Sequence, residues 1–358
     1  MSSAETTQST LSRLSKTNRA DPQDGAYTPS ARRSRKQPLT ERDGVTLREE
    51  VRDYAAVDGD RATTWNRAIR QYRLYLEDRE GIESVFESES GETARGGDPH
   101  RFDPDYSDKQ YAKLKDLERG VSEAFGKRLH TAMLTFTATS TPDGDPLPPV
   151  DHLDGLLESW DPARRALDRA LGDRRYARLA ILEPHPGDGV NNGYLHIHLA
   201  VFVEGKITQR DLEPVIEAHL RNCDLAERDA HDPSDESTIS IRHAGADRDQ
   251  GDLEDDHLDE LAIYLAEYLG TYGDDDPLEE PEHVQASNAV LWATNRQRWR
   301  PCQTAQEFMA YEPPDTGGEW TLVGIEKDDE LIECDGTGGG VETFTTATDR
   351  PPDTAAAD

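Results

Sequence analysis

Two apolar runs joined by a loop rich in glycine and asparagine constrain this chain more than any other feature. The first run is Tyr176 to Glu183, the second is Tyr194 to Val203, and the loop between them is Gly187 to Gly193. Short apolar runs separated by such a loop are typical of neighbouring antiparallel strands. We therefore expect a β-hairpin here.

Three polar residues of these runs lie near the loop that joins them. His196 and His198 are two positions apart, so a strand would direct both imidazoles to one face of the sheet. Glu183 ends the first run, and the hairpin would place its carboxylate beside them. An unpaired carboxylate there would be costly, whereas a divalent cation such as Mg²⁺ or Mn²⁺ bound by all three would remove that cost.

Two other interpretations of these residues remain. Histidines of a sheet can simply be hydrogen-bonded core side chains. His185 is a rival third ligand, but Pro184 and Pro186 flank it and are expected to end the ladder before it, so we prefer Glu183. A metal held by His196, His198 and Glu183 would keep open positions for a phosphate oxygen.

The surrounding pattern predicts an order of strand, helix, strand, strand, helix, strand, helix. This order favours an α+β fold, a ferredoxin-like or RRM-like antiparallel sheet with flanking helices. The elements outside the hairpin are strands at 131–139 and 238–243 and helices at about 150–171, 209–220 and 256–272.

The expected domain organisation has five parts. They are a disordered tail (1–40) with a basic patch at 32–36, a helical appendage and linker (41–99), a catalytic domain (100–275), a small C-terminal DNA-contact region (276–334) and a disordered acidic tail (335–358). Ser107 and Gln110 resemble a capping box at the start of the helix that leads into the catalytic domain.

The C-terminal region combines aromatic and basic residues within and after a helix expected near 286–299. This composition suits stacking on unpaired bases, although cations in a last helical turn are also favoured by the helix dipole. The residues concerned are Trp292, Arg296, Arg298, Trp299 and Arg300.

The charge is the opposite of what binding to nucleic acid would favour. Of 358 residues, 73 are Asp or Glu and 40 are Lys or Arg, which gives a net charge of −33. The acidic residues are spread along the whole chain and Lys is scarce beside Arg, as in proteins of extreme halophiles. In molar salt the Debye length is only ~3 Å, so such a surface would hardly repel DNA.

Several classes of protein are disfavoured. The three cysteines are far apart, which indicates neither a disulfide framework nor a cysteine zinc site. No signal peptide and no run of about 20 apolar residues is present, so we expect a cytoplasmic protein without a membrane span. The absence of a P-loop motif argues against a fused helicase.

Tyrosines mark the helix expected at 256–272. Its buried stripe includes Leu261 and Leu265, and Tyr272 falls within that stripe. Tyr264 and Tyr268 lie one turn apart at the edge of the stripe, where their hydroxyl groups could reach a cleft.

Residues 128–275 resemble the HUH superfamily of rolling-circle replication initiators, as found on haloarchaeal plasmids or viruses. The resemblance rests on three motifs in the family's order: the strand Met133-Leu134-Thr135-Phe136-Thr137, the His-hydrophobic-His strand, and the Tyr-x-x-x-Tyr helix. Glu267 departs from the pattern, because many members carry lysine immediately before the second tyrosine.

The resemblance implies an HUH endonuclease fold and a metal-dependent enzyme. Tyr268 and Tyr264 would nick and rejoin single-stranded origin DNA through a 5′-phosphotyrosine, and a host helicase and polymerase would act as partners. A relaxase or transposase would use the same chemistry. A non-catalytic RRM-like DNA-binding protein and a metal-dependent oxygenase are the other classes, and the tyrosine helix argues against both.

Overall fold

The computed structural model describes residues 29–42, 44–52, 56–57, 60–97, 100–102, 104–187, 189–244, 276–309, 320–327 and 330–333. The chain divides into two compact units. The larger unit comprises residues 1–78 and 99–313, and the smaller comprises residues 79–98 and 314–358. Each unit has its own sheet system.

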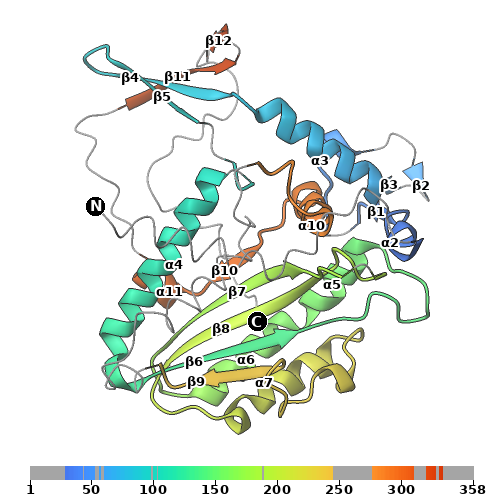
Figure 1. Ribbon diagram of the computed structural model, residues 1–358, viewed down its shortest axis with the longest axis vertical. Helices are drawn as coiled ribbons and strands as arrows, with labels where there is room; N and C mark the ends of the chain where they lie inside the picture. The colour runs from blue at the N-terminus through green and yellow to red at the C-terminus, as the bar shows by residue number, and fades with distance from the viewer. Residues whose placement is uncertain are drawn as a thin grey trace, which may run out of the picture. The chain divides into compact units, whose positions relative to one another are not determined.

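A five-stranded antiparallel sheet forms the centre of the larger unit (Figure 1). The strand order is β10-β7-β8-β6-β9, and each strand runs antiparallel to its neighbours. The predicted α+β class with an antiparallel sheet is therefore confirmed. The bounds are β6 (Leu129–Phe136), β7 (Tyr176–Pro184), β8 (Leu195–Glu204), β9 (Ile239–Arg242) and β10 (Trp299–Pro301).

One face of this sheet packs on α5 (Pro149–Glu158), α6 (Trp160–Leu171) and α7 (Gln209–Asn222). The sequence predicts one helix from about 150 to 171, but the structure has a break at Ser159. Pro162 explains the break, because it has no N–H for the carbonyl of Glu158 and its ring would collide with that carbonyl in a continuous helix. In the first turn of α6 the proline is tolerated.

The opposite face packs on α4 (Pro104–Phe125) and α11 (Gln303–Phe308). The apolar stripe of α4, which includes Leu114 and Val121, is buried as its spacing predicts. The predicted capping box is wrong, because α4 starts at Pro104 and both Ser107 and Gln110 lie inside the helix. A short 3₁₀ turn, η2 (Gly126–Arg128), links α4 to β6.

The N-terminal elements join the same unit. They are α2 (Pro29–Ser34), β1 (Pro38–Thr40), η1 (Glu49–Val51), β2 (Ala56–Val57), β3 (Asp60–Thr64) and α3 (Trp65–Arg79), with strand order β1-β3-β2. Ala31 and Leu39 are buried, so the expected disordered tail does not extend to residue 40. The helix α10 (Glu282–Ala293) is buried from Val284 to Ala293 against these elements, and η3 (Arg228–Ala230) precedes β9.

The smaller unit contains a four-stranded antiparallel sheet of order β12-β11-β4-β5. Its strands are β4 (Glu83–Ser88), β5 (Thr93–Gly97), β11 (Trp320–Lys327) and β12 (Glu330–Glu333). β11 and β12 form a hairpin, and so do β4 and β5. The second hairpin occupies the end of the segment 41–99, where a linker was expected, and β11 from the C-terminal part of the chain pairs with β4.

The C-terminal region expected at 276–334 is divided between the two units. Residues 276–309 belong to the larger unit, where β10 extends the central sheet, and β11 and β12 belong to the smaller one. The helix expected at 286–299 ends at Ala293, and Trp299 is in a strand.

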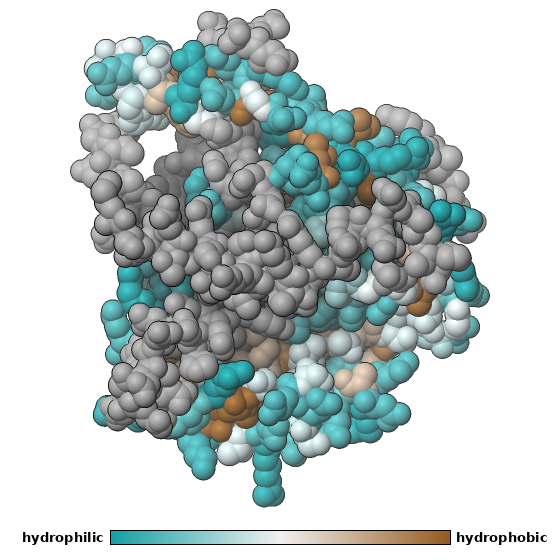
Figure 2. Space-filling model, viewed as in Figure 1, coloured by the Kyte–Doolittle hydropathy of each residue, from teal (hydrophilic) through white to brown (hydrophobic). Residues whose placement is uncertain are grey.

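Hydrophilic side chains dominate the described surface seen in Figure 2. Within the described ranges, Leu74 is the one large hydrophobic side chain that is exposed, at 54%. No helix in the described part of the chain is both long and apolar enough to cross a bilayer.

Candidate metal centre

The pairing of β7 with β8 brings the three predicted ligands together. Glu183 is directly opposite His196, and Ile181 is opposite His198. Alternate residues of these strands, among them Ile181 and Phe202, pack on the α4 side of the sheet. Side chains two residues apart on a strand point to the same face of the sheet. Glu183 is two residues from Ile181, and His198 and His196 are four and six residues from Phe202, so all three lie on that face.

The ligand atoms of this cluster converge. Glu183 Oε2 lies 3.0 Å from His196 Nε2 and in close contact with His198 Nε2, and the two Nε2 atoms are 3.0 Å apart. All three side chains are more than 90% buried. Of the groups of histidine, cysteine and acidic residues in the described ranges, this one alone could hold a metal ion.

The donor set fits a divalent cation. Glu183 Oε2 is buried and makes no hydrogen bond of acceptable geometry, although both imidazoles approach it. Two Nε2 atoms at 3.0 Å cannot both carry a proton that points at the other, so one of them presents a lone pair. A carboxylate oxygen and two imidazole nitrogens that converge in this way are a ligand set for Mn²⁺, Mg²⁺ or a similar ion.

The protonation states of the cluster also suit a cation. Burial alone would raise the pKa of Glu183, but His196 and His198 outweigh it and lower that pKa to about 2. Burial lowers the pKa of His196, against the opposing effect of Glu183. At neutral pH the carboxylate is therefore ionised and the His196 imidazole is neutral, which is the state that binds metals.

Thr135 on β6 orients one of the ligands. It is directly opposite His198, and its Oγ1 lies 3.2 Å from His198 Nδ1. This contact occupies Nδ1 and leaves Nε2 directed at the cluster, as outer partners of metal-bound histidines do. The sequence placed Thr135 in a motif strand without showing what it contacts, and the register between β6 and β8 supplies that answer.

His185, the rival ligand, lies against the cluster but outside it. Its ring stacks on His196 with centroids 4.4 Å apart. Burial, followed by repulsion from the protonated form of His196, lowers the pKa of His185 to about 3. The ladder continues past Pro184, since the His185 N–H donates to Tyr194 O at 2.9 Å. The preference for Glu183 therefore agrees with the structure, although the expected end of the ladder does not.

The hairpin loop beside the cluster is anchored by α2 and the residue after it. Ser34 Oγ donates to Val190 O at 2.6 Å, and the buried Arg35 donates to Asn192 Oδ1. Gly193 has a φ of +77°, and a Cβ there would lie 3.0 Å from Arg35 and 3.1 Å from Ala286. Part of the basic patch assigned to a disordered tail thus supports the site.

The residues expected to contact DNA occupy different environments. Trp292 is fully buried and contacts the rings of Tyr72 and Tyr75, so a role in stacking on bases does not fit its position. Arg300 and Trp299 are half-buried on β10.

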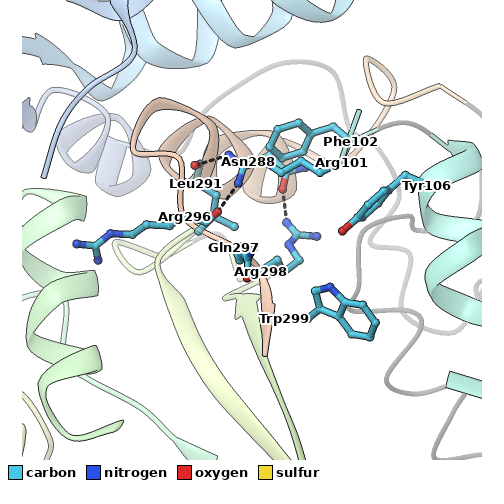
Figure 3. A pocket seen from close by; sticks show the side chains of 9 residues that line it. All are labelled: Arg101, Phe102, Tyr106, Asn288, Leu291, Arg296, Gln297, Arg298 and Trp299. Carbon is cyan, nitrogen blue, oxygen red and sulfur yellow. Dashed lines mark hydrogen bonds between the residues drawn. The ribbon is translucent and has the colours of Figure 1, made fainter. Parts of the chain in front are cut away.

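Two other residues of that group lie beside a pocket (Figure 3). Arg296 is ion paired with Asp154, and Arg298 donates to Asn288 Oδ1. Trp299 lines the same pocket.

The predicted nucleophiles Tyr264 and Tyr268 lie outside the described residues, as do Glu267 and Tyr272. Several other histidines are structural in the described part of the chain. His152 and His219 contact the carbonyls of Ala138 and Thr137, and His231 contacts the N–H of Thr137.

Fold and cluster together define an antiparallel α+β protein with a buried candidate metal centre of two histidines and one glutamate. The chain belongs to the family described as "Putative rep protein (DUF1424)", which matches residues 36–353. No solved structure shows significant similarity to the chain.

Two relatives are haloarchaeal. An uncharacterized 36 kDa protein of Halobacterium salinarum is 42% identical over 309 residues, which cover 83% of this chain and 94% of the relative. An uncharacterized 36 kDa protein of Halobacterium sp. (strain GN101) is 40% identical over 311 residues, which cover 82% and 92%.

Proposed function

We propose that this protein is a rolling-circle replication initiator of the HUH type. In this proposal it nicks and rejoins single-stranded origin DNA with a tyrosine nucleophile and a divalent metal. The observation that carries the proposal is the convergence of Glu183, His196 and His198 on one sheet face in a chain of a rep family.

The strand arrangement supports an HUH fold. Along the chain, β6, α5 with α6, β7, β8, α7 and β9 follow the order β-α-β-β-α-β. In the sheet the four strands stand as β9-β6-β8-β7, so the first and third strands are central. This is the split βαβ arrangement of ferredoxin-like folds, and its third strand carries both histidines.

His196, His198 and Glu183 would hold Mg²⁺ or Mn²⁺, with Thr135 orienting His198. When bound, such an ion acts as a Lewis acid on a phosphodiester oxygen. The ionised Glu183 and the two imidazoles would keep it on the face of the sheet that carries Trp299, where a DNA strand would have to pass.

Tyr268 is proposed as the initiating nucleophile and Tyr264 as the second. The tyrosine hydroxyl loses its proton to solvent as its oxygen bonds to phosphorus, the bond from phosphorus to the 3′ oxygen breaks, and the 3′ oxygen takes a proton from solvent to leave as a hydroxyl group. The 5′ end stays on the enzyme as a phosphotyrosine. The free 3′-hydroxyl would then serve a host polymerase while a host helicase opens the duplex.

A nicking assay on single-stranded oligonucleotides that carry the plasmid or viral origin tests the proposal. The wild-type protein should cleave with Mn²⁺ and form a covalent adduct, and excess EDTA should abolish both. His198→Ala should lower cleavage about 100-fold or more, because a direct ligand matters at least as much as its outer partners. His243→Ala, at an exposed histidine of the same domain, is the matched control.

Mass spectrometry of the trapped adduct tests the nucleophile. The nucleotide should lie on Tyr268 in a single turnover, and Tyr268→Phe should remove it, whereas Tyr264→Phe should mainly impair the closing step. Tyr272→Phe is the control within the same predicted helix. Full cleavage in EDTA, or an adduct on Tyr272, would contradict the proposal.

A further inference from the structure

A pocket lies beside the candidate metal centre in the larger unit. Its lining residues come from three places in the chain (Figure 3). These are the first turn of α4 with the segment before it, the helix α10, and the strand β10 with the residues before it. The lining residues are Arg101, Phe102, Tyr106, Asn288, Leu291, Arg296, Gln297, Arg298 and Trp299.

The lining has a composition unlike that of the whole chain. The chain has 73 acidic residues, yet none of the nine lining residues is acidic and three are arginines. Arg296 extends away from the pocket to its ion pair with Asp154, so Arg101 and Arg298 are the cations of the lining (Figure 3). The aromatic rings of Phe102, Tyr106 and Trp299 make up the other main part of the lining. A ligand that is both anionic and flat matches this combination, since aromatic faces stack on bases and guanidiniums bind phosphate.

The arginines are held in place by polar contacts. Both Nη atoms of Arg101 donate to backbone carbonyls, those of Leu291 and Arg296, at 2.6 Å. Burial, followed by the charge of Arg48, lowers the pKa of Arg101 to about 10, so the guanidinium is still charged at neutral pH. Asn288 accepts a hydrogen bond from Arg298, which fixes the second cation.

Figure 3 shows the side chains of Phe102, Tyr106 and Trp299 around Arg298. The hydroxyl of Tyr106 points toward Arg298, and the indole of Trp299 lies below both. Tyr106 and Trp299 are half-buried, so each ring has an accessible part, whereas Phe102 is buried at 8% exposure.

The register of the central sheet connects the pocket to the metal centre. Trp299 is paired with Ile181, Ile181 with His198, and His198 with Thr135. These residues form one row across four strands, and Trp299 packs on the α4 side of the sheet, which is the side of the metal ligands. Two strand spacings separate the backbone of Trp299 from that of His198, about 10 Å.

The ladder also extends toward Glu183. The N–H of Leu182 donates to Arg298 O at 2.8 Å, which places Arg298 one residue from the level of Glu183. If the scissile phosphate of a DNA strand lies at the cluster, a neighbouring nucleotide of that strand would therefore lie at this pocket.

We propose that this pocket binds one unpaired nucleotide next to the scissile phosphate, with the base stacked on Trp299 and Tyr106 and a phosphate near Arg101 and Arg298. This inference rests on the proposed function, because the identity of the neighbouring site as a nicking centre defines which nucleotide is meant. The pocket itself can be tested without cleavage.

Anisotropy of fluorescein-labelled dT20 in 2 M KCl with EDTA measures binding in the absence of metal. Trp299→Ala in the full-length protein should weaken binding roughly 5- to 100-fold, the range known for loss of one stacked base. Trp299→Phe should restore most of the affinity. Trp160→Ala removes a half-buried tryptophan of α6 outside the pocket and should leave binding unchanged.

A 20-mer of abasic residues separates stacking from phosphate contacts. Wild-type protein and Trp299→Ala should bind this strand equally, because it offers no base to Trp299. Equal losses on both strands, unchanged binding of dT20 by Trp299→Ala, or no binding of dT20, dA20 or dC20 by the wild type would each overturn the proposal.

Failure of the pocket and failure of the proposed function give different results. If the protein forms the phosphotyrosine adduct but Trp299→Ala does not change its affinity for dT20, the pocket does not bind the nucleotide and the proposed function stands. A protein that binds dT20 through Trp299 but never cleaves the origin lacks the proposed catalytic function and keeps the nucleotide site.

Discussion

The hydroxyl group of Thr135 is positioned beside His198 by the pairing of β6 with β8. It lies 3.2 Å from His198 Nδ1, on the side of the ring away from Glu183. Without it, the imidazole could rotate or adopt the tautomer with its proton on Nε2, and the ligand set would lose its arrangement.

Thr135→Val should therefore weaken Mn²⁺ binding about 10- to 100-fold with little loss of stability, since valine keeps the shape and removes the hydroxyl. Isothermal titration of Mn²⁺ into the protein in molar KCl measures this. Thr131→Val is the control, because Thr131 is a buried threonine on the same strand and opposite Phe202. Equal affinities for the wild type and Thr135→Val would refute the role given to the hydroxyl.

His219 should make the fold sensitive to acid. It is buried, with Nε2 2.9 Å from Thr137 O and Nδ1 2.7 Å from Ser159 Oγ, and burial lowers its pKa from 6.5 to about 4. The unfolded chain thus binds the proton first as the pH falls. Stability is fully present above about pH 6.5, is lost between there and pH 4, and changes no further below.

The loss from this residue should be about 2 kcal/mol between pH 7.5 and pH 5. Urea unfolding of the wild type and of His219→Gln at both pH values measures it, and the variant should show a pH dependence smaller by that amount. The same pH dependence in both proteins would mean that His219 does not titrate between the folded and unfolded states.

The hairpin of β7 and β8 is the element on which the site depends. Its two strands pair through nine residues, so Glu183 and His196 are locked opposite each other. Gly193 closes the loop with a φ of +77°, where a side chain would be strained and would press on Arg35 and α10.

Gly193→Ala should cost about 2 to 4 kcal/mol, from the backbone conformation together with the close contacts. Gly144→Ala is a matched control, since Gly144 has a φ of +83° but open space around the position of a Cβ. It should cost only about 1 to 2 kcal/mol. Denaturant unfolding gives both values, and equal losses would show that the contacts around Gly193 contribute nothing.

Charge dominates the behaviour of the whole molecule. A net charge of −33 opposes compaction at low ionic strength, and salt bridges such as that between Arg228 and Glu217 are exposed and worth little. The relatives come from Halobacterium, in agreement with a protein that works in concentrated salt.

Raising KCl from 0.1 M to 2 M should stabilise the protein by about 3 kcal/mol, which would raise Tm by roughly 4 °C for a chain of this length. Thermal unfolding followed by circular dichroism measures the change. Sucrose at matched osmolality controls for solute exclusion, because it does not screen charge. A Tm that falls with KCl would contradict the interpretation of the composition as salt adaptation.

The sequence by itself determined the candidate metal ligands and the α+β class. Alternation along a strand and a short hairpin loop are local properties, and together they place Glu183, His196 and His198 on one face without knowledge of the rest of the chain. The tertiary structure decided the positions of Thr135, Trp292 and Trp299. The positions of Thr135 and Trp299 depend on the pairing of strands far apart in the chain, β6 with β8 and the three-residue strand β10 with β7. The burial of Trp292 depends on the elements that pack around α10. A local pattern can set neither the register of such distant strands nor the packing around a helix.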